Sequence, residues 1–295
     1  MRDGLVVVDK PAGWTSHDVV ARLRRIYGQR RVGHAGTLDP DATGVLLVGL
    51  GRATRLLRFL QEAGKAYRAR VAFGVATDTL DASGAVLERT EMPLTRARVV
   101  GAARRFVGEI EQVPPMVSAI KLGGRKLYEF AREGKEVERA ARRVRVDRLE
   151  VVDFEPGPYP EATIDVECGS GTYIRTLAVD LGTALGGCAH LASLRRTRVG
   201  SFTLDEARPI EAIEADPDAA VVPLAGAVRD LPGVVVDDTV ARAVAHGATF
   251  PANAIVGDDD RPGPFAVLNA EGELLAVYER RGRGLKPAVV VGSAS

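Results

Sequence analysis

Short apolar runs and strictly alternating positions predict several strands in the first two-thirds of the chain. Leu5–Val8 is an unbroken apolar run that ends at a lysine-proline turn, which predicts a short buried strand. From Tyr67 to Phe73 apolar residues alternate with polar or small ones, which predicts a strand with Tyr67 on its buried face. Thr163–Cys168 predicts a further strand, so sheet structure is expected on both sides of the chain midpoint.

Helical periodicity fills the segments between these strands. Apolar residues recur at spacings of three and four from Val19 to Tyr27, with Thr15 or Ser16 as the N-cap and Gly28 just beyond the end. The same spacing predicts three more helices: an amphipathic one over Arg52–Gln61, one capped by Thr95, and one running from Ile174 to Leu185.

The composition changes after Leu204. Residues 205–260 contain 12 acidic and 3 basic residues with five prolines, which is typical of a linker-like segment. Beyond it, glycine turns separate short apolar runs that predict a small β-rich domain. The sequence therefore predicts a large domain over 1–230 and a small one over 231–295. The runs are Val234–Val236, Phe265–Leu268, Leu274–Tyr278 and Ala288–Val291.

Bulk composition excludes several classes of protein. The chain has 295 residues, of which 46% are hydrophobic and 27% charged, and it has no apolar run long enough to cross a bilayer. The N-terminus lacks a signal-peptide apolar region, so a cytoplasmic location is expected. Cys168 and Cys188 lack metal-site spacing and are expected to be buried free thiols.

Charge is distributed unevenly along the chain. Residues 1–204 carry 32 basic and 24 acidic residues (net +8), and residues 205–295 carry 8 and 15 (net −7), which together give the overall +1. Five arginines lie between Arg22 and Arg31, and a basic face of the Arg52–Gln61 helix is a candidate phosphate contact. The segment 112–148 mixes basic residues with Tyr128 and Phe130. This pattern suits an arm that grips nucleic acid, although a solvated insertion has the same composition.

The stretch Gly33–Gly44 contains His34, Asp39, Pro40 and Asp41 immediately before the apolar run Val45–Leu50. Its glycines and proline predict an irregular, shaped loop. Read alone, the loop is equally a surface turn with solvated carboxylates and a catalytic loop that presents Asp39.

Motifs along the chain together resemble the TruB family of tRNA pseudouridine synthases, with a weaker similarity of the tail to the RNA-binding PUA domain. The resemblance covers roughly residues 4–204. It implies an α/β (α+β) fold with a mixed, largely antiparallel sheet flanked by helices, a thumb-like insertion over 112–148 and a PUA-like C-terminal domain. The motifs are Asp9-Lys10-Pro11, Gly33-His34-Ala35-Gly36-Thr37-Leu38-Asp39-Pro40, Lys65-Ala66-Tyr67, Gly171-Thr172-Tyr173-Ile174-Arg175-Thr176 and Leu194-Arg195-Arg196.

The resemblance implies conversion of uridine to pseudouridine at position 55 in the T arm of tRNA, by base flipping and without a metal or other cofactor. Asp39 occupies the catalytic position, as a nucleophile on the sugar or as a base. A monomer that also folds tRNA as a chaperone is expected. The implied substrate-binding residues are Arg175 as the partner of Asp39, Tyr67, Tyr173 and Leu194 around the flipped base, His34, and Lys10.

Two other functions compete with this interpretation. A purely non-catalytic RNA chaperone would use the basic arm and the aromatic residues without Asp39. A glycosidase would use Asp39 and Asp41 together, but two carboxylates two residues apart in one loop rarely reach the separation that such chemistry needs. Asp41 also departs from the family pattern, in which an apolar or small residue is common after Pro40.

Overall fold

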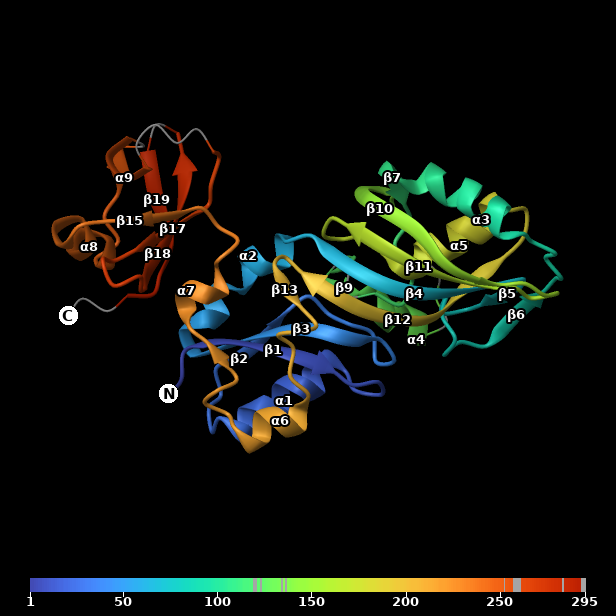
Figure 1. The fold of residues 1–295 in the computed structure, drawn as a ribbon, viewed down its shortest axis with the longest axis horizontal. Helices are drawn as coiled ribbons and strands as arrows, with labels where there is room; N and C mark the ends of the chain where they lie inside the picture. The colour runs from blue at the N-terminus through green and yellow to red at the C-terminus, as the bar shows by residue number, and fades with distance from the viewer. Residues whose placement is uncertain are drawn as a thin grey trace.

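Two β-sheets organise the protein (Figure 1). The structure, a computed structural model, describes residues 1–118, 121–122, 124–133, 135, 137–251, 253–256, 261–282 and 284–292. The larger sheet has ten strands and holds the N-terminal three-quarters of the chain, and the smaller one has five strands near the C-terminus. The predicted mixed, largely antiparallel sheet flanked by helices is confirmed.

The larger sheet has the order β14-β1-β3-β12-β4-β11-β10-β7, with β2 added on β3 and β13 on β12. In the described part of the chain its pairings are antiparallel except for β12 with β3. Its strands are β1 (Gly4–Lys10), β2 (Val32–Ala35), β3 (Thr43–Leu50), β4 (Lys65–Phe73), β7 (Gly108–Gln112), β10 (Arg142–Glu155), β11 (Glu161–Cys168), β12 (Ala189–Val199), β13 (Phe202–Thr203) and β14 (Val221–Val222).

Burial on both faces explains the unbroken apolar run in β1. Successive side chains of a strand point to opposite faces, and here Val6 and Val8 join one apolar cluster while Leu5 and Val7 join another. Strand β4 instead alternates as predicted, with Tyr67 8% exposed and its polar neighbours outside. A strand that is buried on both faces therefore shows an unbroken apolar run in its sequence. A strand that is buried on one face shows alternating apolar and polar residues.

Helix caps follow the sequence prediction closely. Thr15 caps the first helix in a capping box with Asp18, Gly28 follows the helix with φ +60°, and Thr95 caps the third helix. The helices are α1 (Ser16–Ile26), α2 (Leu57–Glu62), α3 (Arg96–Ala103), α4 (Leu127–Arg132), α5 (Ile174–Ala184), α6 (Ile210–Ala215), α7 (Leu224–Ala227), α8 (Asp238–Ala245) and α9 (Asn253–Val256), with 3-10 turns η1 (Gly51–Arg55) and η2 (Arg104–Phe106).

The predicted Arg52–Gln61 helix is wrong in its continuity. A 3-10 turn occupies its first half, and α2 begins only at Leu57. Arg52 donates to the carbonyl of Val291 at 2.5 Å, and Arg55 donates to that of Val290 at 2.6 Å. These arginines fasten the C-terminal domain to the large sheet.

The acidic segment after Leu204 also has an internal partner. Helix α6 lies beside α1 (Figure 1), and Glu214 forms an ion pair with Arg22 at 2.5 Å. Asp218 pairs with Arg2 in the same region. Part of the charge asymmetry between the two halves of the chain is therefore neutralised within the protein.

The C-terminal sheet has the order β15-β17-β18-β19-β16 and packs on the large sheet through a shared apolar cluster. Val277 and Val289 from this sheet join Leu56 and Leu60 in that cluster. The chain leaves the large sheet after β14 and enters the small one at Gly233. Its strands are β15 (Gly233–Val235), β16 (Phe250–Pro251), β17 (Phe265–Leu268), β18 (Leu274–Arg281) and β19 (Gly284–Val290).

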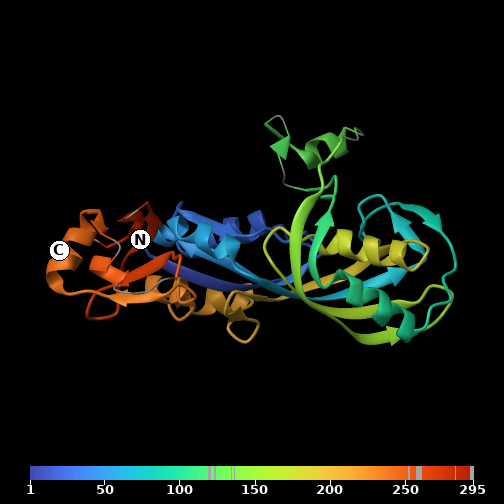
Figure 2. The ribbon, with the colours of Figure 1, turned by 90° about the horizontal axis from the view of Figure 1, so that it is seen from above.

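The segment between β7 and β10 stands out from the body of the protein, as the green arm of Figure 2 shows. It contains β8 (Lys121–Leu122), β9 (Arg125–Lys126) and α4, and a second small hairpin elsewhere joins β5 (Val75–Thr77) to β6 (Val86–Arg89). In the arm, Arg125 lies 4.4 Å from the Phe130 ring centre and pairs with Glu133. Tyr128, the other aromatic residue of the arm, has a side chain outside the described part of the structure.

Cys168 is buried as predicted, whereas Cys188 is only partly buried, so that prediction holds for one of the two thiols. Both are free. Within the described ranges, no helix is long and apolar enough to cross a membrane.

Candidate active site

The loop that carries Asp39 is shorter than the sequence suggests. Residues 33–35 belong to β2 and Thr43 begins β3, so the irregular segment is limited to residues 36–42. Gly36 at its start has φ +83°, and Gly44, just inside β3, has φ +100°. Ser16 holds the middle of the loop, because its hydroxyl accepts a hydrogen bond from the Leu38 N–H at 3.0 Å. The carbonyl of Pro40 accepts one from the N–H of Gly13 at 3.0 Å. The loop is thus a fixed structure rather than a flexible turn.

Lys10 holds this loop through a hydrogen bond to its backbone and does not line the cleft. Its buried ammonium donates to the carbonyls of Pro11 at 2.8 Å, Trp14 at 2.5 Å and Pro40 at 2.8 Å, which engages all three of its N–H groups. Burial lowers the pKa of Lys10 to about 8, while the carboxylates of Asp41 and Asp39 oppose this shift. The geometry corrects the assignment of Lys10 to substrate binding, because its role is to position the loop.

Replacing Gly44 with alanine should destabilise the protein strongly. A Cβ at Gly44 would lie 2.1 Å from the carbonyl oxygen of Arg196 on β12, in a left-handed backbone conformation. We expect a loss of about 3 kcal/mol in the free energy of unfolding, measured by urea denaturation. Gly28→Ala is the matched control, because Gly28 also has a positive φ but no atom near its Cβ position, and it should cost about 1 kcal/mol. Equal losses in the two variants would contradict the proposed clash.

Asp39 at the centre of the loop pairs with Arg175 from the first turn of α5. Arg175 Nε lies 2.9 Å from Asp39 Oδ2, and Arg175 Nη2 lies 3.3 Å from Oδ1. The Arg175 side chain is 5% exposed and Asp39 is 41% exposed. The arginine is therefore a fixed, buried cation, and the carboxylate stays accessible to a substrate. This pairing also explains a cation at a helix N-terminus, where the helix dipole disfavours it.

Asp81 places a second carboxylate near Arg175. Its Oδ2 lies 3.8 Å from Arg175 Nε. The turn that carries it is shaped by Leu80, a non-glycine residue at φ 65°. The hydroxyl of Thr79 donates to Asp81 Oδ1 at 2.7 Å. Sequence reasoning missed this residue, because Asp78–Gly84 has only the signature of a polar turn. Its role becomes visible only when the fold brings the turn to α5.

Burial and nearby charges shift the pKa of Asp39 in opposite directions. Burial raises the pKa of Asp39 above its ordinary value, Arg175 lowers it, and the charge of Asp81 raises it again. The net direction is upward because burial is the largest of these effects. Because the contact with Arg175 is short and direct, we still expect Asp39 to be ionised at neutral pH.

Asp39 and Arg175 line a cleft of about 430 Å³. Six of the seven sequence-predicted site residues contribute to its wall, and only Lys10 does not. Tyr67 also belongs to the main apolar cluster and Leu194 packs against it, so Tyr67 is part of both the core and the cleft wall. The lining residues are His34, Gly36, Thr37, Leu38, Asp39, Gln61, Lys65, Tyr67, Ser118, Gly171, Thr172, Tyr173, Ile174, Arg175, Leu194 and Arg196.

The base of the arm is fastened to this cleft. Gln112 accepts a hydrogen bond from the N–H of Tyr173 at 3.0 Å and donates to its carbonyl at 3.3 Å. Arg175 Nη2 donates to the carbonyl of Val117 at 2.8 Å. The arm that is expected to hold RNA and the residues that surround Asp39 therefore form one connected unit.

His34 lies in the cleft wall with its Nδ1 buried and without a hydrogen-bond partner among the described residues. Its ring meets that of His17 edge-on, with 5.4 Å between the ring centres. Burial lowers the pKa of His34, and the positive charges of His17 and Arg196 add to this effect, so a neutral imidazole is expected at neutral pH. Asp41 is exposed and does not line the cleft, so this departure from the family pattern adds no second carboxylate to the cleft wall.

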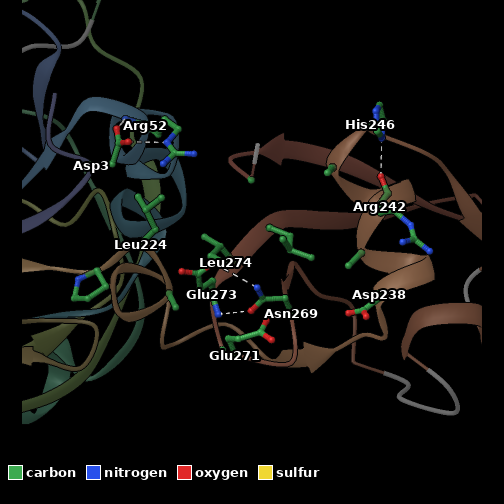
Figure 3. A pocket seen from close by; sticks show the side chains of 17 residues that line it. Asp3, Arg52, Leu224, Asp238, Arg242, His246, Asn269, Glu271, Glu273 and Leu274 are labelled. Carbon is green, nitrogen blue, oxygen red and sulfur yellow. Dashed lines mark hydrogen bonds and ion pairs between the residues drawn. The ribbon is translucent and has the colours of Figure 1, made fainter. Parts of the chain in front are cut away.

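A larger cavity of about 750 Å³ lies elsewhere, between the two sheets (Figure 3). Several of its polar side chains already have partners within the protein: Asp3 with Arg52, at 2.7 Å, and Glu273 with Asn269. In the part of the chain that the structure describes, no group of three or more His, Cys, Asp or Glu residues is arranged to hold a metal ion. The cleft at Asp39 is therefore the better candidate for chemistry despite its smaller size.

Comparison with known proteins agrees with this geometry. Residues 24–174 match the family described as "TruB family pseudouridylate synthase (N terminal domain)", and residues 175–219 match "tRNA pseudouridylate synthase B C-terminal domain". The chain belongs to the TruB family of pseudouridylate synthases. The resemblance seen in its motifs is thereby confirmed, and so is its assignment as an isomerase that converts uridine to pseudouridine.

Relatives at high identity cover nearly the whole chain. A protein of Thermobifida fusca named "tRNA pseudouridine synthase B" is 46% identical over 98% of this chain and 99% of its own length. A protein of the same name from Symbiobacterium thermophilum is 53% identical over 83% of this chain and 82% of its own. Among solved structures, "Crystal Structure of a Cbf5-Nop10-Gar1 Complex" contains a chain that matches this TruB-family protein with a TM-score of 0.78 and 28% identity, over 99% of this chain and 85% of that one.

Proposed function

We propose that this TruB-family enzyme isomerises the uridine at position 55 in the T arm of tRNA, with Asp39 as its catalytic residue. The observation that carries the proposal is the accessible Asp39 carboxylate held against the buried Arg175 in a cleft walled by Tyr67, Tyr173 and Leu194. The tRNA substrate is supported by the relatives named tRNA pseudouridine synthase B.

The reaction needs the target base outside the RNA stack. A uracil that is flipped into the cleft would meet the ring of Tyr67 and the apolar side chain of Leu194, which offset part of the cost of unstacking. The C1′–N1 bond then breaks, the uracil turns, and C5 joins C1′. Asp39 serves this sequence as a nucleophile on the sugar or as a base on a sugar proton, and both routes require the ionised carboxylate.

Recognition of the T arm is assigned to the segment 112–148. RNA loops are read by shape and by unstacked bases, and a projecting arm attached at the cleft mouth through Gln112 and Tyr173 suits that task. We further propose that the protein acts as a monomer in the cytoplasm and that its grip on tRNA also assists tRNA folding. Light scattering of the purified protein tests the first of these statements.

A minimal substrate tests the proposed site of modification. A T-arm stem-loop carrying uridine tritiated at C5 should release tritium within about tenfold of the rate for full-length tRNA. A D-arm stem-loop of equal length, labelled in the same way, should release none. Equal release from the two stem-loops, or release from tRNA in which uridine 55 is replaced by cytidine, would contradict T-arm specificity.

A further inference from the structure

Two buried cations, Lys65 and Arg196, line the cleft that contains Asp39. Lys65 is 7% exposed and Arg196 is 1% exposed, yet both contribute to the cleft wall. Both pack against Gly36, the first residue of the catalytic loop. A Cβ there would lie 3.6 Å from Arg196 Nη1 and 3.7 Å from Lys65 Cε. The catalytic loop therefore begins directly over two positive charges.

The hydrogen-bond partners of these cations are neutral. Lys65 donates to the carbonyls of Gln61 at 2.9 Å and Ala63 at 2.8 Å. Arg196 donates to those of Val45 at 2.7 Å and Gly36 at 3.2 Å. No carboxylate among the described residues forms an ion pair with either group. Two Lys65 hydrogen bonds leave one of its three N–H groups for another acceptor.

Such an arrangement costs stability and calls for an anion from outside the protein. A buried charge without a counter-charge carries a large desolvation penalty, and two like charges near one another add repulsion. Burial lowers the pKa of Lys65 to about 8, with Arg196 from β12 adding to the shift and Cys168 from β11 opposing it. The phenol of Tyr67 on β4 faces Arg196. Stability alone does not explain why these cations are here.

We propose that Lys65 and Arg196 form a cationic floor that stabilises the negative charge on the uracil while it is detached from the sugar. The inference rests on the proposed function. When the C1′–N1 bond breaks, its electron pair remains with the uracil and spreads over N1, O2 and O4. When C5 bonds to C1′, the C5 proton leaves and N1 gains a proton, so the cations neither give nor take one. Fixed charges that face developing charge in a site shielded from water are an effective form of catalysis.

A backbone phosphate is the competing anion, and burial argues against it. Phosphates stay at the surface of bound RNA, whereas the two cations are nearly inaccessible and lie beside Tyr67, against which the base is expected to stack. A phosphate contact would affect mainly tRNA affinity and its salt dependence. A contact with the detached uracil would affect mainly the reaction rate of the enzyme–tRNA complex. The two candidate anions therefore predict different experimental results.

Lys65→Met tests the proposal because it keeps the length of the side chain and removes its charge. We expect a loss of about 10²-fold in the single-turnover rate at saturating tRNA, with a Kd for tRNA within threefold of wild type. The wild-type rate should fall above about pH 8 as Lys65 loses its proton, and this alkaline decline should be absent in the variant. Arg68→Met, on the exposed face of the same strand, should keep the wild-type rate.

A second variant separates charge from hydrogen bonding. Lys65→Gln retains donor hydrogens for the carbonyl of Gln61 but is neutral, so its loss of rate should match that of Lys65→Met. A rate within threefold of wild type in either folded variant overturns the proposal, and so does a loss confined to tRNA affinity, which would assign the cations to a phosphate. Failure of the proposed function is distinct, because the wild-type protein would then release no tritium at all.

Discussion

Asp39→Asn should lower the rate of pseudouridine formation by roughly 10³-fold or more. The amide has the shape of the carboxylate but is neither a nucleophile toward the sugar nor a base. It retains one oxygen to accept a hydrogen bond from Arg175, which contacts Asp39 through Nε and Nη2, so the cleft should keep its form. The measurement is tritium release in a single turnover, at saturating tRNA labelled at C5 of uridine.

The matched control is Asp41→Asn, in the same loop. Asp41 is exposed and outside the cleft lining, so this variant should react within threefold of wild type. Asp39→Asn should still bind tRNA within a few-fold of the wild-type affinity and should still accelerate tRNA refolding if the chaperone activity is present. A residual rate above one-tenth of wild type in Asp39→Asn would remove Asp39 from the catalytic position.

Arg175→Met should reduce turnover by about 10²-fold and shift the acid side of the pH–rate profile toward higher pH. Arg175 is the cation between Asp39 and Asp81, and burial and Asp81 both raise the pKa of Asp39. Without the guanidinium these two effects lose their main opponent, and only the smaller effect of Lys10 still lowers the pKa, so Asp39 takes up its proton at a higher pH. Single-turnover rates over a pH series measure the shift, and tRNA affinity should change less than the rate.

Arg175→Lys provides the graded comparison. Lysine retains the positive charge but lacks the planar fork, in which Nε and Nη2 contact Asp39, Nη2 also donates to the carbonyl of Val117, and Nη1 donates to that of Thr79. Its rate and the acid side of its profile should fall between those of wild type and Arg175→Met. If the three proteins share one acid limb, the pairing does not control the protonation of Asp39.

Features that depend on neighbours in the chain were predictable from the sequence. The Thr15 cap, the Gly28 end of α1 and the alternation of β4 are each set by a few adjacent residues, and the structure has them as predicted. The site residues other than Lys10 were located through motifs, and the fold places those six around one cleft.

Features that depend on tertiary partners were not predictable in the same way. Asp81 belongs to a turn whose composition shows only that it is polar. Its contact with Arg175 of α5 depends on the tertiary fold. The arginines Arg52 and Arg55 give the same periodic signal whether they face RNA or, as here, the carbonyls of a second domain. Lys65 lies in a strand with no sign that its charge is buried without a carboxylate. In each case the missing information is a long-range contact.

The central claim is that the cleft at Asp39 converts one uridine of the tRNA T arm to pseudouridine. The most direct test is nucleotide-resolution mapping of pseudouridine in an unmodified tRNA transcript after incubation with the purified protein. We predict near-complete conversion at position 55, none at the other uridines, and none at position 55 when Asp39→Asn replaces the wild type. Pseudouridine at a different position, or equal conversion by the two proteins, would contradict the claim.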